Sequence, residues 1–329
     1  MAQSDSKTAV TLAVAGNAFL AVMKGLAFFF SGSGAMLSEA IHSVADTGNQ
    51  ALLYVGIRRS ERPANALFHY GFGAERFFFA LMSAVGIFVL GCGVTLYHGV
   101  HLLLHPVVPQ VGWLDFAVLG LGLLVDGAVL GKAVMVVRNQ KGQTPFFRYL
   151  KESTDPTLAA VLLEDGVACF GILVALAGIG AAQATGSSIP DAVATLTIAM
   201  LMGAIAFWLG YKNRSLILGS ALPPEQHKEV VDFLRAQPSV SKVSRAKSRI
   251  VGAGRFRFTA EIDWNADVLA DRQQEWVEGH WPAEAADRRR FTQQFAERLT
   301  QSIADEVDRL EGELRVAFPQ LQHLDLEDD

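Results

Sequence analysis

Six apolar stretches, each long enough to cross a lipid bilayer, constrain this chain more than any other feature. A hydrocarbon core about 30 Å thick requires about 20 apolar residues in a helix. The stretches cover residues 9–30, 36–57, 77–100, 113–137, 157–181 and 190–211. Continuous apolar runs of this length are typical of helices that satisfy their own backbone hydrogen bonds in lipid. We therefore predict an α-helical membrane domain of six transmembrane spans over residues 1–214.

The charged residues are concentrated after the last of these stretches. Residues 1–214 carry 13 basic and 12 acidic residues, whereas residues 215–329 carry 15 and 21, which gives this second part a net charge of −6. This contrast predicts a soluble acidic domain over 215–329. The whole chain has a net charge of −5 and no basic stripe, which argues against nucleic-acid binding. Both cysteines lie in apolar runs, which excludes a disulfide framework.

The loops between the spans predict the orientation in the membrane. The segments before span one, at 212–214 after span six, and joining spans two to three and four to five hold eleven basic residues. The other three loops, at 31–35, 101–112 and 182–189, hold none. Positive residues favour the cytoplasmic side, so we expect both termini and the acidic domain to be cytoplasmic. The start of the chain has no Arg-rich leader, which favours a bacterial inner membrane.

The soluble part shows helix and strand periodicities in the order αββαβ. A helix is expected over 225–236, strands over 241–251 and 255–264, a long amphipathic helix over 283–316, and a last strand over 321–326. Gly252 and Gly254 are expected to form the turn between the first two strands. We predict a small α+β, ferredoxin-like layer, with 265–282 as a surface loop or insertion.

Ionisable residues inside the apolar spans are the strongest indication of function, because placing each one in the bilayer costs on the order of a few kcal/mol. In span two the spacing of Glu39, His42, Asp46 and Asn49 places all four on one face of a helix. Span five carries adjacent carboxylates at Glu164 and Asp165. At a rise of about 1.5 Å per residue, these two groups fall at a similar depth near the middle of the bilayer. An imidazole with several carboxylates suits a divalent transition metal.

The remaining charged residues of the spans have weaker claims to a metal. Asn49 is expected in a supporting or helix-contact role, and Glu39 near the outer end is expected to meet water or relay protons. Asp126 in span four is a candidate for helix pairing or proton relay. Lys24 in span one is expected to extend its ammonium group to the membrane surface.

Together these motifs resemble the cation diffusion facilitator family of divalent metal transporters. The matching features are the His42-xxx-Asp46 motif, Asp165, the six spans and the αββαβ tail. The loop at 62–76 and the Pro190-Asp191 pair are similar to family segments as well. Members with a Leu-Glu-Asp triplet in span five, as at 163–165 here, form the most similar branch.

The resemblance implies a homodimer that exchanges a divalent cation, most often zinc, for protons. It also implies a tetrahedral metal site formed by His42, Asp46 and Asp165. The family's fourth ligand lies four residues before the span-five aspartate, where this chain has Val161. We predict Glu164 as the substitute, with Glu39 or a water molecule as alternatives.

Other metal sites known in the family are expected to be missing here. Phe72 stands where the first cytoplasmic loop often has a histidine ligand, and the tail histidines at 227, 280 and 323 are scattered. We therefore expect the tail to serve in dimerisation, with its metal binding in question.

The predicted function is metal efflux by proton antiport with alternating access, without a resident cofactor. Zinc is the first candidate as cargo, and Fe²⁺, Mn²⁺, Co²⁺ and Cd²⁺ suit the same ligands. The alternatives are a secondary transporter for protons or a non-metal solute, and a membrane-anchored scaffold protein. No Gly-rich phosphate loop or catalytic triad is present in the sequence, which argues against an enzyme.

Overall fold

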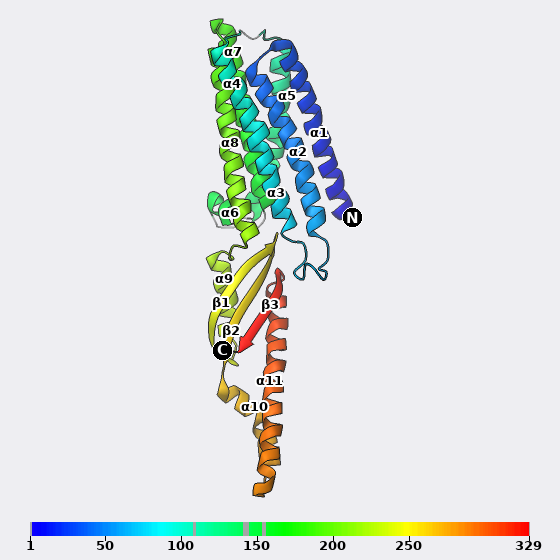
Figure 1. Cartoon of the computed structure of the whole chain (residues 1–329), viewed down its shortest axis with the longest axis vertical. Helices are drawn as coiled ribbons and strands as arrows, with labels where there is room; N and C mark the ends of the chain where they lie inside the picture. The colour runs from blue at the N-terminus through cyan, green and yellow to red at the C-terminus, as the bar shows by residue number, and fades with distance from the viewer. Residues whose placement is uncertain (1, 108–109, 141–144, 153–155, 329) are drawn as a thin grey trace. The chain divides into compact units, whose positions relative to one another are not determined.

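A computed structural model describes residues 2–107, 110–140, 145–152 and 156–328. The chain divides into two compact units, Met1–Leu218 and Gly219–Asp329. Over its described residues the first unit contains helices and loops but no strand, and the second combines helices with a three-stranded sheet (Figure 1).

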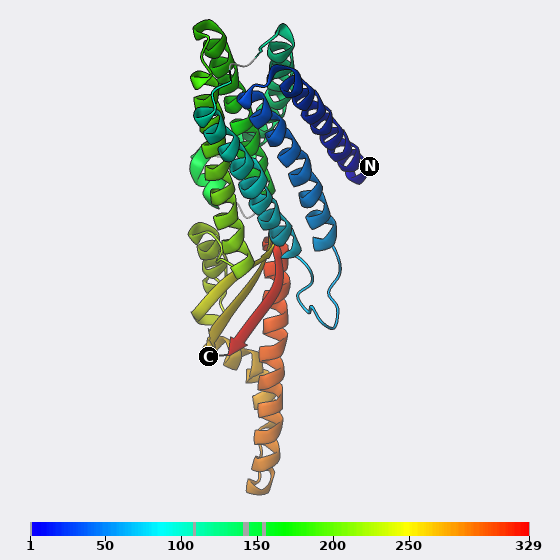
Figure 2. The ribbon, with the colours of Figure 1, turned by 45° about the horizontal axis from the view of Figure 1, so that its top comes forward.

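The membrane unit consists of long helices that match the six predicted spans. They are α1 (Ala2–Ser31), α2 (Gly34–Ser60), a continuous third span, α5 (Trp113–Gln140), α7 (Pro156–Thr185) and α8 (Ile189–Leu218). The third span runs from α3 (Glu75–Gly86) through the π-helix η1 (Ile87–Val94) into α4 (Thr95–Leu104). A short helix, α6 (Phe146–Glu152), precedes α7 and was not predicted. The long helices run side by side in both views (Figures 1 and 2).

Four of the spans qualify as membrane-crossing by length and apolarity alone: 75–104, 113–139, 160–185 and 189–218. In α1 the apolar part is shorter, at Gly16–Ser31. Helix α2 falls outside this group because it carries the polar stripe of the predicted site. Many large apolar side chains of the bundle are exposed, among them Phe29, Leu124 and Phe207, as expected for helices that face lipid.

Helix α2 packs against α1, α3, α7 and α8, and thus lies within the bundle. Its N-terminus is fixed by Asp191 of α8, which is fully buried. The Asp191 carboxylate accepts hydrogen bonds from Ser33 Oγ at 2.7 Å, Gly34 N at 2.7 Å and Ala35 N at 3.2 Å. An acidic group at a helix N-terminus satisfies free N–H groups and is stabilised by the helix dipole. This contact explains the Pro190-Asp191 motif as a structural link between α8 and α2.

The second unit has the predicted α+β order with one additional helix. Its elements are α9 (Pro224–Arg235), β1 (Val240–Gly252), β2 (Arg255–Trp264), α10 (Ala266–His280), a 3-10 turn η2 (Ala285–Asp287), α11 (Arg288–Ala317) and β3 (Leu321–Asp328). The sheet order is β1-β2-β3, with β1 antiparallel to β2 and β3 parallel to β2. The tight turn into β2 has Gly254 at φ +63°, a conformation that favours glycine.

The core of this unit lies between the sheet and two helices. Alternate residues of the central strand, from Phe256 to Ile262, are buried, as the period-two pattern predicted. Helix α9 packs on β1, α11 packs on β3, and the two helices contact each other. Leu234 from α9 and Leu310 and Leu314 from α11 are fully buried there.

The prediction of a loop over 265–282 was wrong. Asn265 begins helix α10 by accepting a hydrogen bond from the Asp267 backbone N–H. Trp276 of α10 then stacks on Phe291 of α11 at 5.5 Å between ring centroids. The helix forms because α11 offers an apolar surface beyond the edge of the sheet, which the local sequence does not reveal.

Candidate metal site in the membrane domain

The polar stripe of α2 faces the interior of the bundle, as the spacing predicted. Glu39, His42, Asp46 and Asn49 are all buried, with exposed fractions between 0 and 9%. His42 Nε2 lies 3.3 Å from Asp46 Oδ2, one helical turn further along. An imidazole and a carboxylate at this spacing present two metal-binding groups from one helix face.

Helix α7 contributes the predicted carboxylates next to this stripe. Glu164 is buried and accepts a hydrogen bond from the Asn49 side-chain amide Nδ2. The Oδ1 atom of the same Asn49 side chain accepts a hydrogen bond from Ser83 Oγ of α3. Asp165 is half-buried, and the charge of Asp46 acts on both Glu164 and Asp165. Asn49 therefore links three helices and holds Glu164 beside α2.

Several buried nitrogen and oxygen atoms of these side chains have no hydrogen-bond partner among the described residues. They are His42 Nδ1 and Nε2, Asp46 Oδ1 and Asp165 Oδ2. Buried polar atoms are nearly always paired, and a bound cation would satisfy one ring nitrogen of His42 together with the two carboxylate oxygens. Over the described ranges, however, no three His, Cys, Asp or Glu side chains are close enough to hold a metal ion. The tetrahedral site with His42, Asp46, Asp165 and Glu164 thus remains a prediction.

Val161, at the position of the family's usual fourth ligand, lies in an apolar environment. It packs against a cluster of buried residues that includes Val137 and Leu162. Asp126 of α5 is buried, and its charge acts on Lys24 and Asp165. Lys132, also on α5, is exposed.

The expectation that Lys24 extends to the membrane surface was wrong. Lys24 is fully buried, and its Nζ lies 2.9 Å from Glu39 Oε2. The expectation that Glu39 meets water was also wrong, because this side chain is fully buried. The position of Lys24 in the middle of an apolar stretch could have indicated this pairing, since a buried cation needs a buried anion. Ser83 was missed altogether, and no spacing in the sequence points to it.

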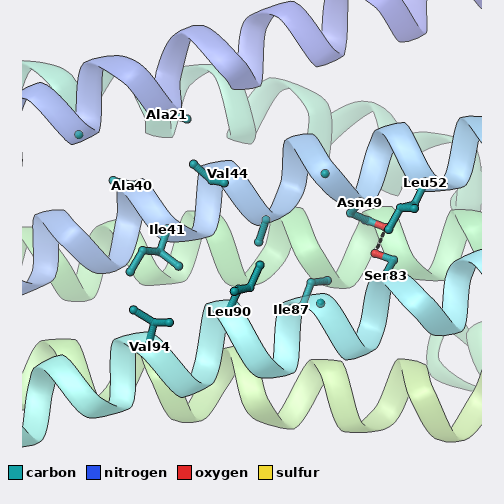
Figure 3. A pocket seen from close by; sticks show the side chains of 14 residues that line it. Ala21, Ala40, Ile41, Val44, Asn49, Leu52, Ser83, Ile87, Leu90 and Val94 are labelled. Carbon is teal, nitrogen blue, oxygen red and sulfur yellow. Dashed lines mark hydrogen bonds between the residues drawn. The ribbon is translucent and has the colours of Figure 1, made fainter.

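A groove of about 510 Å³ runs along α2 and, of the polar stripe, is lined only by Asn49 (Figure 3). Its walls are apolar side chains from α1, α2 and η1, including Ile41, Val44 and Leu90. Asn49 and Ser83 are its polar lining residues. Such a surface suits lipid or a neighbouring apolar helix and offers no ligands to a cation.

Two histidines of the soluble unit have partners within that unit. His227 Nδ1 lies 3.0 Å from Ser248 Oγ, and His280 Nδ1 lies 2.9 Å from the Trp276 carbonyl oxygen. His69 is exposed in the loop after α2. These contacts assign structural roles to His227 and His280.

Comparison with known proteins settles the family. The sequence profile of the cation efflux transmembrane domain matches residues 10–218. The chain belongs to the cation efflux, or cation diffusion facilitator, family. The match covers the membrane unit from residue 10 onwards, including α2 and α7.

Two of three relatives resemble this family member over nearly its whole length. The human protein named proton-coupled zinc antiporter SLC30A9, mitochondrial, is 35% identical over 332 residues, which cover 97% of this chain and 58% of the relative. Metal tolerance protein C4 of Arabidopsis thaliana is 35% identical over 335 residues, covering 98% and 73%. Cation-efflux pump FieF of Escherichia coli is 25% identical over 261 residues, covering 78% and 81%. The chain thus spans little more than half the length of the human relative.

Proposed function

We propose that this protein is a divalent metal efflux transporter, with zinc as its principal cargo, that works by metal/proton antiport and not as an enzyme. The observation that carries the proposal is the buried His42–Asp46 pair with its unpartnered donor atoms. The membership in the cation efflux family supports it. The names of the human and plant relatives support zinc or a similar metal.

The proposed cargo site uses His42 and Asp46 of α2 with Asp165 and Glu164 of α7. Metal binding requires a neutral imidazole and ionised carboxylates, so protons and metal compete for the same lone pairs. A metal ion that enters from the cytoplasm displaces protons. When the site opens to the other side, protons from that side displace the metal, as in alternating access around a fixed midplane site.

This mechanism requires the two helices to approach more closely when cargo is bound. The ligands lie in two groups, one on each helix, and Asn49 connects them through Glu164. Cargo then draws Asp165 towards His42 and Asp46, and its release lets the helices separate. Asn49 acts as the supporting residue, and Asp126 and Glu39 are candidates for relaying protons.

We propose a cytoplasmic location for both termini, based on the eleven basic residues on one side and none on the other. Labelling with a membrane-impermeant maleimide tests the orientation in intact cells. A single cysteine at Lys228, in a chain with both native cysteines replaced, should stay unlabelled until the membrane is opened.

Metal uptake into proteoliposomes with an imposed pH gradient tests the function. We expect zinc uptake that depends on the gradient and is accompanied by proton release from the vesicles. His42→Ala and Asp46→Ala should each abolish uptake, while His69→Ala in the exposed loop should retain it. A panel with Fe²⁺, Mn²⁺, Co²⁺ and Cd²⁺ ranks the cargo ions. Uptake that continues at the normal rate in His42→Ala would show that the cargo site lies elsewhere.

A further inference from the structure

The buried ion pair between Lys24 of α1 and Glu39 of α2 is not needed for the proposed cargo site. The Nζ–Oε2 distance is 2.9 Å, and the two side chains are 0 and 1% exposed. A buried ion pair is weak evidence for stability, because apolar residues of similar size would often serve the fold as well. Inside a membrane unit, such a pair therefore indicates a functional requirement for its charges.

Two glycines on other helices make room for this pair. A Cβ at Gly122 of α5 would lie 3.2 Å from Lys24 Cε, and a Cβ at Gly171 of α7 would lie 2.8 Å from Glu39 Oε1. The ion pair is thus enclosed by α1, α2, α5 and α7. Side chains larger than glycine at these two positions would press against it.

The pair lies next to the proposed cargo site. Glu39 precedes His42 by three residues on the same buried face of α2. The charge of Lys24 acts on His42, Asp46 and Asp126. Glu39 Oε1 is buried without a hydrogen-bond partner among the described residues, so only the other oxygen is engaged by Lys24.

We propose that Lys24 is a positioning residue that holds Glu39 away from the cargo site and thereby sets the affinity at which metal is released. The inference rests on the metal transport proposed above. A fixed ammonium group near the site weakens the binding of a cation by repulsion. Its contact with Glu39 also withholds a further carboxylate from the metal. A transporter needs binding strong enough for entry and weak enough for release.

Removing Lys24 and removing Glu39 should shift the affinity for metal in opposite directions. Lys24→Met removes the repulsion and frees Glu39. The Kd and KM for zinc should therefore fall by about tenfold or more. The kcat should fall as well, because metal release is slower. Glu39→Gln leaves the Lys24 charge without its anion, so Kd and KM should rise by about tenfold or more. In the double variant the two effects oppose each other, and KM should return to within about threefold of the wild type.

The experiment measures zinc binding to the full chain in detergent, by competition with a fluorescent chelator, and zinc uptake in proteoliposomes. Lys24→Gln is a second variant that retains a hydrogen-bond donor for Glu39 but not the charge. It should lower Kd less than Lys24→Met does, because the donor still holds the carboxylate. If the Lys24 variants do not fold, Glu39→Gln carries the test through its expected rise in Kd.

The results that overturn the inference differ from those that overturn the function. If the wild type transports zinc and both single variants shift Kd in the same direction, the pair is only a structural link between α1 and α2. An unchanged or lower Kd in Glu39→Gln overturns the inference as well. If the wild type neither binds nor transports zinc or the other metals of the panel, the proposed function fails, whatever the variants do.

Discussion

At the residue scale, the membrane unit assigns different partners to chemically similar groups. Glu39 is bound by a buried ammonium group, whereas Glu164 is bound by the Asn49 side-chain amide. The Lys24 ammonium group compensates the charge of Glu39, whereas the Asn49 amide is a neutral partner for Glu164. Glu164 is therefore held by a neutral group and not by a competing cation, which supports its selection as the substitute for the missing ligand at Val161.

Glu164→Gln should weaken zinc binding by about tenfold, or about 1.4 kcal/mol, because a carboxylate ligand becomes a neutral amide. The glutamine carbonyl can still accept the hydrogen bond from Asn49, so the fold should be retained. Competition with a fluorescent chelator measures the affinity, and size-exclusion chromatography checks the fold. Glu61→Gln, at the exposed end of α2, is the matched control. An unchanged affinity would indicate that Glu39 or water completes the site.

At the element scale, close helix contacts in the membrane unit depend on small residues. Lipid provides no hydrophobic driving force between helices, so association relies on tight packing. A Cβ at Gly178 of α7 would lie 2.4 Å from Ala194 Cβ and 3.1 Å from the Pro190 carbonyl oxygen of α8. A Cβ at Gly180, two residues further along α7, would meet no atom within 4 Å.

Gly178→Ala should destabilise the protein by about 1–3 kcal/mol, because α7 and α8 must separate to admit the methyl group. Gly180→Ala should leave stability unchanged or raise it slightly, since alanine favours a helix over glycine. Thermal unfolding in detergent measures both variants. Equal unfolding midpoints for the two would contradict the tight α7–α8 contact.

Helices α10 and α11 of the soluble unit are joined by a buried carboxylate. Glu306 Oε2 accepts a hydrogen bond from Arg272 of α10 at 2.8 Å, and Oε1 accepts one from Arg309 at 2.7 Å. The hydrogen bond from Arg309, supported by that from Arg272, lowers the pKa of Glu306 to about 2 against the opposing effect of burial. The contact fixes α10 at the side of α11.

Glu306→Gln should lower the local stability of α10 by about 2 kcal/mol at neutral pH, because two charge-assisted hydrogen bonds become neutral ones. Amide hydrogen exchange of residues 266–280 in the full chain measures this change. Glu297→Gln, on the exposed side of α11, is the control and should leave exchange unaltered. Equal protection in both variants would show that the Trp276–Phe291 stack alone holds α10.

The same contact predicts a dependence on pH. The pKa of Glu306 is lowered to about 2 from an ordinary value of 4.5, so the folded state favours the ionised form. Its contribution is fully present above pH 4.5 and is lost as the pH falls towards 2. The difference in stability between wild type and Glu306→Gln should therefore shrink over this range. A difference that stays constant down to pH 2 would contradict the ion pair.

At the scale of the whole molecule, we expect the protein to be a homodimer, a state the family resemblance implies. The soluble part carries a net charge of −6, so two copies facing each other repel at low ionic strength. The contribution of the soluble part to dimerisation should weaken near 0.01 M salt, where the screening length is about 30 Å. Light scattering of the full chain in mild detergent at low and high salt measures the mass. A monomer at high salt and high concentration would contradict the expectation.

The sequence alone was sufficient to predict the spans, the αββαβ order apart from helix α10, and the polar face of α2. These follow from local periodicity: runs of about 20 apolar residues, alternation in β2, and a spacing of three and four in α2. The identity of His42, Asp46, Asp165 and Glu164 as candidate ligands came from the same local reasoning, supported by the family resemblance.

Only the tertiary structure decided which partners the buried charges have. Lys24 and Glu39 are fifteen residues apart on different helices, and Asn49 reaches Glu164 across 115 residues. Helix α10 likewise depends on an apolar surface of α11 that no local pattern reveals. A buried charge takes whichever opposite group the fold brings near it, because leaving it unpaired costs more than any local preference can offset. The pairing of charges is therefore a property of the packed bundle, whereas the spans themselves are a property of the chain.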